Sequence, residues 1–135
     1  MKANFNAFLK ANKREKPTLK LAVSEAFLGE DGKPVEWEIK ALSMAEFNEA
    51  VDKATAPNGM RDRDQMNNDI IAAAVVFPDL SDGDLQDSYG VVDEAGLVRE
   101  MFRGYAGDYV KLLNAIMDYS GLNESLTDKV AEAKN

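Results

Sequence analysis

The stretch VEWEIKALSMAEF, residues 35–47, decides the fold because its hydrophobic period changes from two to nearly four within a few residues. Apolar and charged residues alternate over residues 35–40, which is the pattern of a half-buried strand. Ser43 followed three residues later by Glu46 is a capping box, and it predicts a helix that reaches about Ala54. The stretch therefore predicts a strand that leads directly into a helix.

A partner strand is predicted on the N-terminal side, where apolar residues alternate again from Leu19 onward. The intervening sequence GEDGKP, residues 29–34, has the glycines and proline of a turn, so an antiparallel hairpin is the simplest connection. Two strands alone are marginally stable in water, and helices must therefore cover their apolar face. That face is formed by Leu19, Leu21, Val35, Trp37 and Ile39.

Helices are predicted along most of the remaining chain. Residues 4–12 predict a short amphipathic helix. A helix from about Asp64 through the alanine-rich run IIAAAVVF, residues 70–77, is predicted at the centre of the core, and Pro78 ends it. Asn123 is expected to cap a last polar helix. Between these, shorter helices that end near glycines are expected over residues 81–89, 93–102 and 108–120.

The predicted fold class is α+β, mostly helical, with the N-terminal antiparallel hairpin packed against the helices. A length of 135 residues suits one domain, residues 1–135, with a core of useful size. No apolar run approaches the roughly 18 residues of a membrane span, and the first residues lack the continuous apolar centre of a secretory signal. Cysteine is absent, as is common in a reducing compartment. We therefore expect a cytoplasmic protein without membrane association.

The net charge of −8 is distributed unevenly along the chain. Residues 1–20 contain six lysines and arginines and one glutamate, whereas the other 115 residues contain ten basic and 23 acidic side chains. A surface with that acidic balance repels phosphate backbones over most of its area. The basic residues from Lys10 to Lys20 have no aromatic residue between them and are typical of a solvated surface. We expect no nucleic-acid partner.

The residue types of common active sites are missing. There is no histidine and no cysteine, which removes the usual catalytic triads and most zinc sites. The many carboxylates could in principle form acid/base pairs, but they occur in surface-like patterns without flanking aromatic sugar platforms. We therefore expect a protein that is not an enzyme and has no cofactor.

The acidic stretch DLSDGDLQDSYG, residues 79–90, was compared with a calcium-binding loop. With Asp82 in the first ligand position, the obligatory glycine position holds Asp87 and the twelfth position holds Asp93 instead of a bidentate glutamate. A register that begins at Asp79 also fails. The acids are better interpreted as the first turn of a helix, where negative charge offsets the helix macrodipole. No metal site is predicted.

An apolar stripe in the C-terminal half is the candidate partner-binding surface. Tyrosine and methionine are common at adaptable protein surfaces. Helical spacing also requires some buried face, so part of the stripe is expected to be core. The candidate residues are Met101, Phe102, Tyr105, Tyr109, Leu112, Leu113, Ile116 and Met117.

Several blocks along the chain resemble one family, the XkdN-like tail assembly chaperones of long-tailed phages and prophages of Gram-positive bacteria. The resemblance lies in the order and spacing of FNAFLKAN, WEIKALSMAEFNEA, IIAAAVVFPDLSDGDLQDSYGV, MDYSGL and KVAEAKN, which extend nearly from end to end. None of these blocks is a catalytic signature, so no residue role is carried over.

The resemblance implies a non-enzymatic protein of the host cytoplasm that binds the tape measure protein, keeps it soluble and assists tail tube assembly. It implies contact with the tape measure protein and possibly the tail tube protein, and absence from the mature virion. Self-association is possible. The alternative hypothesis from the charge distribution is an acidic protein that occupies the basic surface of a nucleic-acid-binding partner.

Overall fold

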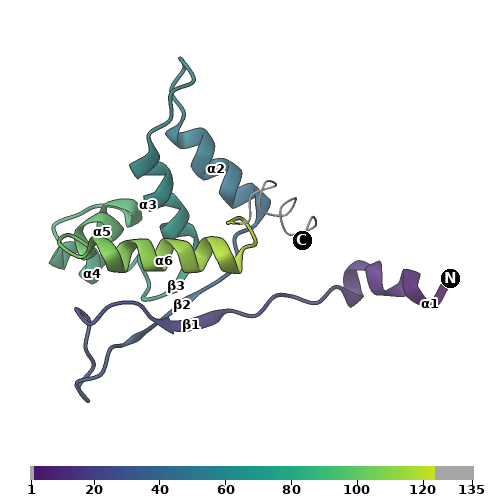
Figure 1. Cartoon of the computed structure of the whole chain (residues 1–135), viewed down its shortest axis with the longest axis horizontal. Coiled ribbons are helices and arrows are strands. Elements are labelled where there is room, and N and C mark those ends of the chain that lie inside the picture. Colours follow the sequence, from purple (N-terminus) through teal and green to yellow (C-terminus); the bar gives the residue numbers. More distant parts are fainter. Residues whose placement is uncertain (1, 124–135) are drawn as a thin grey trace, which may run out of the picture.

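The computed structural model describes residues 2–123, with the side chains of residues 2 and 3 excepted. It has the predicted α+β fold, with helices on one side of a three-stranded antiparallel sheet of order β1-β2-β3 (Figure 1). The helix predicted from Asn123 onward lies outside the described residues. Within residues 2–123, no helix combines the length and apolar character that a membrane crossing requires.

The predicted N-terminal hairpin is confirmed. Strand β1 (Leu19–Ala22) pairs antiparallel with β2 (Glu36–Ile39), and Leu21 lies opposite Trp37. The turn is closed by a 2.9 Å hydrogen bond from the Gly29 amide to the Lys33 carbonyl. Trp37 and the neighbouring Ile39 are buried, whereas the outer apolar residues of the predicted face, Leu19 and Val35, are each 37% exposed. The helices therefore cover only part of that face.

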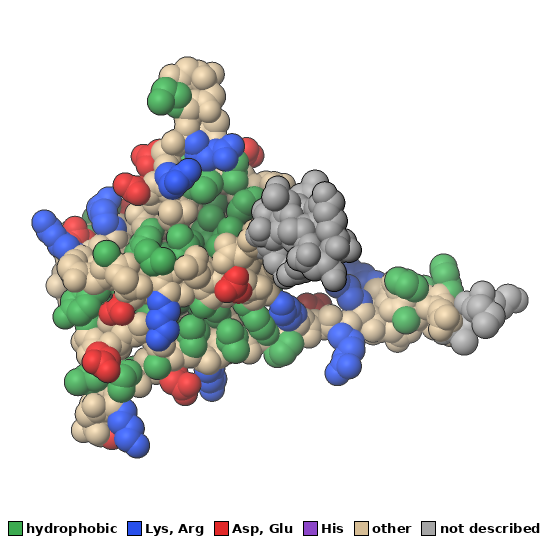
Figure 2. Space-filling model, in the orientation of Figure 1, with side chains coloured by type: hydrophobic (Ala, Val, Ile, Leu, Met, Phe, Trp, Pro, Cys, Tyr) green, Lys and Arg blue, Asp and Glu red, His purple; other side chains and the backbone are tan. Residues whose placement is uncertain are grey.

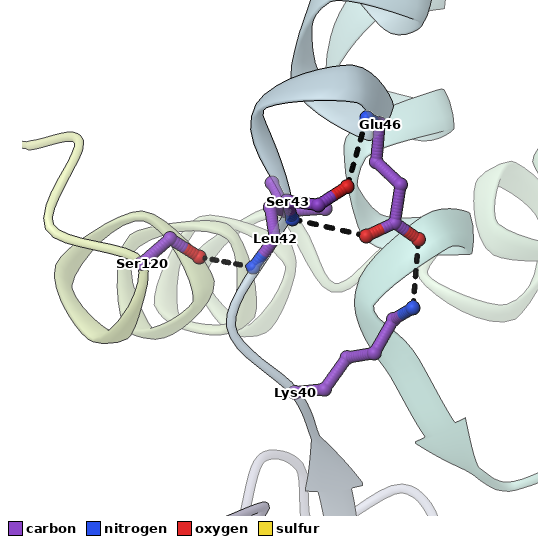
Figure 3. Close-up of polar contacts among 5 residues, drawn as sticks. All are labelled: Lys40, Leu42, Ser43, Glu46 and Ser120. Atoms are coloured by element: carbon purple, nitrogen blue, oxygen red, sulfur yellow. Dashed lines mark hydrogen bonds and ion pairs between the residues drawn. The ribbon is translucent and has the colours of Figure 1, made fainter. Parts of the chain in front are cut away.

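The predicted capping box begins helix α2 (Met44–Ala54). The Glu46 amide donates to the Ser43 hydroxyl at 3.1 Å, and the Ser43 amide donates to the Glu46 carboxylate at 3.0 Å (Figure 3). Lys40 forms a 2.7 Å ion pair with the same carboxylate. The Leu42 amide donates to the Ser120 hydroxyl at 2.9 Å, which joins the strand-to-helix junction to the end of α6.

One predicted helix is too long. Helix α3 (Arg63–Ala74) begins at its N-cap Asp62 and ends before the two valines of the IIAAAVVF run. Residues Val75–Phe77 instead form strand β3, with Val75 opposite Ile39 of β2. Adjacent β-branched residues favour extended backbone, and the open edge of β2 supplies the hydrogen-bonding partner. The prediction that this helix lies at the centre of the core is confirmed, since Ile70 and its neighbour are at most 1% exposed.

The three helices that follow occur where glycines predicted their ends. They are α4 (Gly83–Ser88), α5 (Glu94–Met101) and α6 (Ala106–Tyr119). The side chains of Asp82 and Asp93 accept hydrogen bonds from backbone amides at the starts of α4 and α5, as N-cap residues do. The acidic stretch 79–90 is thus a helix start, as predicted.

The N-terminal segment differs from the predicted amphipathic helix. One helical turn, α1 (Lys2–Phe5), is followed by two 3₁₀ turns, η1 (Asn6–Phe8) and η2 (Lys10–Asn12), which bury no residue. We call residues 2–18 the N-terminal arm. The arm points away from the helices along the long axis of the molecule (Figure 1), so the apolar side of the predicted helix has no core to pack against.

The core lies between the hairpin and helices α2, α3, α5 and α6. A chain of aromatic rings crosses it: Trp37 is 5.4 Å from Phe102 and 5.8 Å from Phe27, measured between ring centroids. Ser24, which follows β1, donates a 2.6 Å hydrogen bond to Asp108 on α6. The least exposed large side chains of the core are Trp37, Ile39, Ile70, Ile71, Leu97, Leu112 and Ile116.

Candidate functional site

The structure divides the eight predicted partner-binding residues into three groups by exposure. Four of them belong to the core: Met101, Phe102, Leu112 and Ile116 are between 0% and 7% exposed. Another three are half-buried against the core, namely Tyr109, Leu113 and Met117. Tyr105, just before α6, is 47% exposed. Tyr105 is thus the most accessible of the eight, and contact of this surface with a partner stays a prediction.

An acidic groove of about 1050 Å³ lies between α2, α3 and α5. Three of its seven acids have a structural role, because Glu46, Asp62 and Asp93 cap the starts of the three helices. Among the residues that the structure describes, no group of three or more potential ligands is arranged to hold a metal ion. The seven acids that line the groove are Glu46, Glu49, Asp62, Asp64, Asp69, Asp93 and Glu94.

Asp69 differs from the capping acids of this groove because part of its carboxylate has no partner. Its Oδ2 atom is buried and has no hydrogen-bond partner. Burial raises the pKa of Asp69, and the charges of Asp93 and Glu49 raise it further, whereas Lys53 opposes the rise. The charged form of this carboxylate is therefore unfavourable in the folded protein, and at neutral pH it lowers the free energy of unfolding.

A second groove, of about 420 Å³, is apolar, and we call it the apolar groove. The hairpin, the end of β3, and α4 form its walls. Four of its apolar side chains remain open to solvent: Leu28 is 55% exposed, Phe77 50%, and Val35 and Tyr89 37% each. Large apolar residues grouped in one concave surface mark a binding site for another apolar surface.

The two chain segments that form most of this groove are strongly acidic. Residues 25–36 and 77–90 contain eight acidic residues and a single base, Lys33. The acids are Glu25, Glu30, Asp31, Glu36, Asp79, Asp82, Asp84 and Asp87. The groove therefore combines apolar walls with surroundings that attract positive charge.

Sequence patterns did not indicate the apolar groove. Its members come from a hairpin loop, a strand that was predicted as helix, and a short helix, so no single periodic stretch contains them. The exposed apolar residue Leu28 lies in the hairpin loop, and Phe77 ends the strand that was predicted as helix. They become neighbours only when β3 pairs with β2.

Comparison with known proteins gives three consistent matches. A family model described as phage XkdN-like tail assembly chaperone protein matches residues 5–134. The chain is 21% identical over 136 residues to the phage-like element PBSX protein XkdN of Bacillus subtilis (strain 168), covering 95% of this chain and 91% of that protein. Its fold is similar to the crystal structure of the protein yqbn, with a TM-score of 0.74 and 18% identity, covering 85% of this chain and 93% of that one.

Proposed function

The chain belongs to the family of phage XkdN-like tail assembly chaperones, and we propose that it binds the tape measure protein through its apolar groove and assists tail tube assembly. One observation supports this role above others. Four large apolar side chains, Leu28, Val35, Phe77 and Tyr89, are open to solvent in one groove of a chain with a net charge of −8. An acidic carrier with an apolar groove can shield an apolar helix and keep the complex dispersed.

The proposed client contact is the apolar face of an amphipathic helix. Such a helix buries its anchor residues in a groove and leaves its polar face in water. Acidic surroundings favour clients with lysine or arginine beside the anchors, because those side chains gain favourable charge contacts at the rim. The exposed residue Tyr105 is proposed as a second contact, outside the groove. Residues 1–135 act as one domain in this proposal.

Binding to fragments of the tape measure protein from the same phage element tests the proposal. Replacing Phe77 or Leu28 by serine removes an exposed groove residue, and we expect affinity to fall by about tenfold or more for an anchor residue. Val92→Ser is the matched control, because Val92 is 92% exposed and lies outside the apolar groove. Equal binding by all three variants and the wild type would exclude the apolar groove as the binding site for the tape measure protein. Tyr105→Ser tests the second contact in the same assay.

The salt dependence of binding separates this proposal from the alternative of an acidic protein that occupies the basic surface of a nucleic-acid-binding partner. Burial of apolar side chains survives moderate salt, whereas contact between an acidic and a basic surface weakens as the Debye length shortens to about 8 Å at physiological ionic strength. We expect tape measure binding to persist at moderate salt. We also propose, from the family role, that the protein stays in the host cytoplasm and outside the mature virion. Mass spectrometry of purified virions tests this, and it should detect the tail tube but not this chain.

A further inference from the structure

None of the described side chains of the N-terminal arm packs into the core. Every residue from 4 to 20 is exposed, so no side chain of this segment is held in the core. Three of them are large and apolar within five positions: Phe5 is 65% exposed, Phe8 82% and Leu9 44%. Figure 2 shows such side chains gathered on the projecting segment. Single exposed apolar residues are ordinary, but a group on a projecting segment marks an interaction surface.

The base of the arm is fixed to the body, and this contact directs the arm outward. The Lys16 ammonium group lies 4.0 Å from the ring centroid of Tyr119, and it donates a hydrogen bond to the Tyr119 carbonyl. The Tyr119 hydroxyl donates to the Pro17 carbonyl. The hairpin loop and the arm consequently lie at opposite ends of the molecule (Figure 1). The apolar groove, which the hairpin loop lines, is therefore far from the apolar residues of its own arm.

Arm and groove are complementary in both polarity and charge. Phe5, Phe8 and Leu9 match the exposed apolar walls of the groove. The five bases and single acid of the arm match the eight acids and single base of the two segments around the groove. Opposite charge accelerates association and fixes orientation, while apolar burial supplies most of the affinity.

We propose that the apolar groove of one copy of this chain binds the N-terminal arm of a second copy. Phe5, Phe8 and Leu9 enter the groove beside Leu28 and Phe77, and Lys10, Lys13 and Arg14 face its acidic surroundings. This inference goes beyond the proposed function, because the contact between copies does not depend on any client. It gives the exposed arm a binding partner that is present wherever the chain is made.

The contact joins two unlike surfaces, an arm and a groove, so the way in which copies exchange arms decides the form of the assembly. Two copies that exchange arms reciprocally form a closed dimer, whereas exchange in one direction forms an open chain of copies. At their exposures, Phe5, Phe8 and Leu9 can bury about 400 Å² on the arm and the groove loses a smaller area, so a reciprocal pair buries on the order of 1,200 Å². That area is sufficient for a specific dimer, and the reciprocal form is the one that leaves no groove open.

Sedimentation velocity of the full-length chain, at concentrations from about 10 µM to about 1 mM, measures this association. The arm variant Phe5→Ser/Phe8→Ser and the groove variant Leu28→Ser/Phe77→Ser are each expected to weaken dimer formation by about tenfold or more. Met60→Ser is the control, since Met60 is 71% exposed, on the loop between α2 and α3, and should leave dimer formation unchanged. Circular dichroism before each run selects variants with the wild-type fold.

Mixing the two variants gives the decisive measurement. The arm variant retains an intact groove and the groove variant an intact arm. An equimolar mixture should therefore form a heterodimer through one arm–groove contact, which associates more weakly than the wild-type dimer but more tightly than either variant alone. A concentration-independent wild-type monomer would overturn the proposal, as would a mixture that stays monomeric or a groove variant that dimerises like the wild type.

The same variants distinguish this proposal from the proposed function. Loss of tape measure binding in the groove variant, together with binding in the arm variant that is at least as tight as in the wild type, assigns the groove to both partners, which compete for it, and the arm to self-association. A wild-type monomer whose groove still binds tape measure fragments overturns the arm contact alone. Dimers that form through arm and groove without any tape measure binding overturn the proposed function alone.

Discussion

The phenol oxygen of Tyr109 on α6 donates a 2.7 Å hydrogen bond to Oδ1 of Asn68 on α3. Asn68 is 8% exposed, and it is one of only two buried polar residues, with Ser24, among the described residues. Burial, followed by the charge of Asp64, raises the pKa of Tyr109 to about 12. The hydroxyl therefore keeps its proton, and with it the hydrogen bond, throughout the physiological range. Helix α6 is joined to the central helix by this polar contact as well as by apolar packing.

Tyr109→Phe should lower the free energy of unfolding by about 1–3 kcal/mol, because it leaves the buried Asn68 oxygen without its donor. Urea denaturation at neutral pH measures the change. Tyr105→Phe is the control, since Tyr105 is 47% exposed, and surface changes usually stay within about 0.5 kcal/mol. Equal stability of both variants would mean that water replaces the phenol without cost.

Trp37→Ala should lower the free energy of unfolding by about 3–5 kcal/mol. Trp37 is 2% exposed and its ring contacts those of Phe27 and Phe102, so the substitution leaves a cavity at the point where the hairpin meets the helices. Thermal unfolding followed by circular dichroism measures the loss. Val92→Ala, at a position that is 92% exposed, should change little. An unchanged melting temperature for Trp37→Ala would show that the hairpin is peripheral to folding.

Glu46→Gln removes the ion pair with Lys40 while it keeps an oxygen for the capping box. Burial tends to raise the pKa of Glu46, but the contacts with Lys40 and Ser43 outweigh it and lower the pKa below its ordinary value of 4.5. A lowered pKa in the folded state means that the carboxylate stabilises the fold above about pH 4.5, and that this contribution is lost as the pH falls through the folded-state pKa. Glutamine keeps an oxygen for the Ser43 amide but loses the charge.

Near neutral pH the Glu46→Gln variant should therefore be less stable than the wild type by about 0.5–1 kcal/mol, because the pair is only partly shielded from water. The difference should shrink as the pH is lowered below 4.5. Urea denaturation at several pH values measures it. Glu49→Gln, at the exposed 3.1 Å pair with Lys53, is the control and should change less. A difference that does not depend on pH would show that the amide weakens the cap itself.

The strand-to-helix junction was predictable because its signals are local. The alternation around Trp37 and the Ser43–Glu46 capping box each lie within a few residues, and the structure reproduces both. Strand β3 was not predictable in the same way. The run IIAAAVVF is apolar throughout, and its change from helix to strand at Val75 depends on pairing with Ile39, a residue 36 positions earlier. Only the β-branched character of the two valines gave a local indication.

The structure narrows the candidate binding surface, whose contact with a partner stays a prediction. Periodicity selects the residues of an apolar helix face, but the same spacing describes a buried face, and Leu112 and Ile116 prove to be core. The apolar groove was not predicted, because it is formed by segments that meet only after folding. The arm was predicted as an amphipathic helix and not as a projecting segment. The uneven charge between residues 1–20 and the rest was visible in sequence, yet its relation to the groove required the positions of Leu28 and Phe77.

Asp69→Asn should increase stability at neutral pH, which is the reverse of the usual effect of a substitution inside a fold. The wild-type carboxylate is unfavourable there because its Oδ2 atom is buried without a partner and burial raises its pKa. A raised folded-state pKa means that the penalty is absent below the ordinary value of 3.8 and complete once the pH exceeds the folded-state value. Asparagine has no charge to desolvate, so its advantage should appear as the pH rises and vanish in acid.

Thermal unfolding from acid to neutral pH measures the Asp69 effect, and a gain of about 1 kcal/mol would raise the melting temperature by roughly 3–5 °C for a chain of this size. Asp52→Asn is the matched control: it removes the same charge from an exposed position on α2, so a general relief of the −8 net charge would stabilise both variants equally. A stabilised Asp69→Asn beside an unchanged Asp52→Asn locates the penalty at the buried oxygen. Loss of stability in Asp69→Asn would instead mean that the attraction of Lys53 for the carboxylate exceeds the cost of burying it.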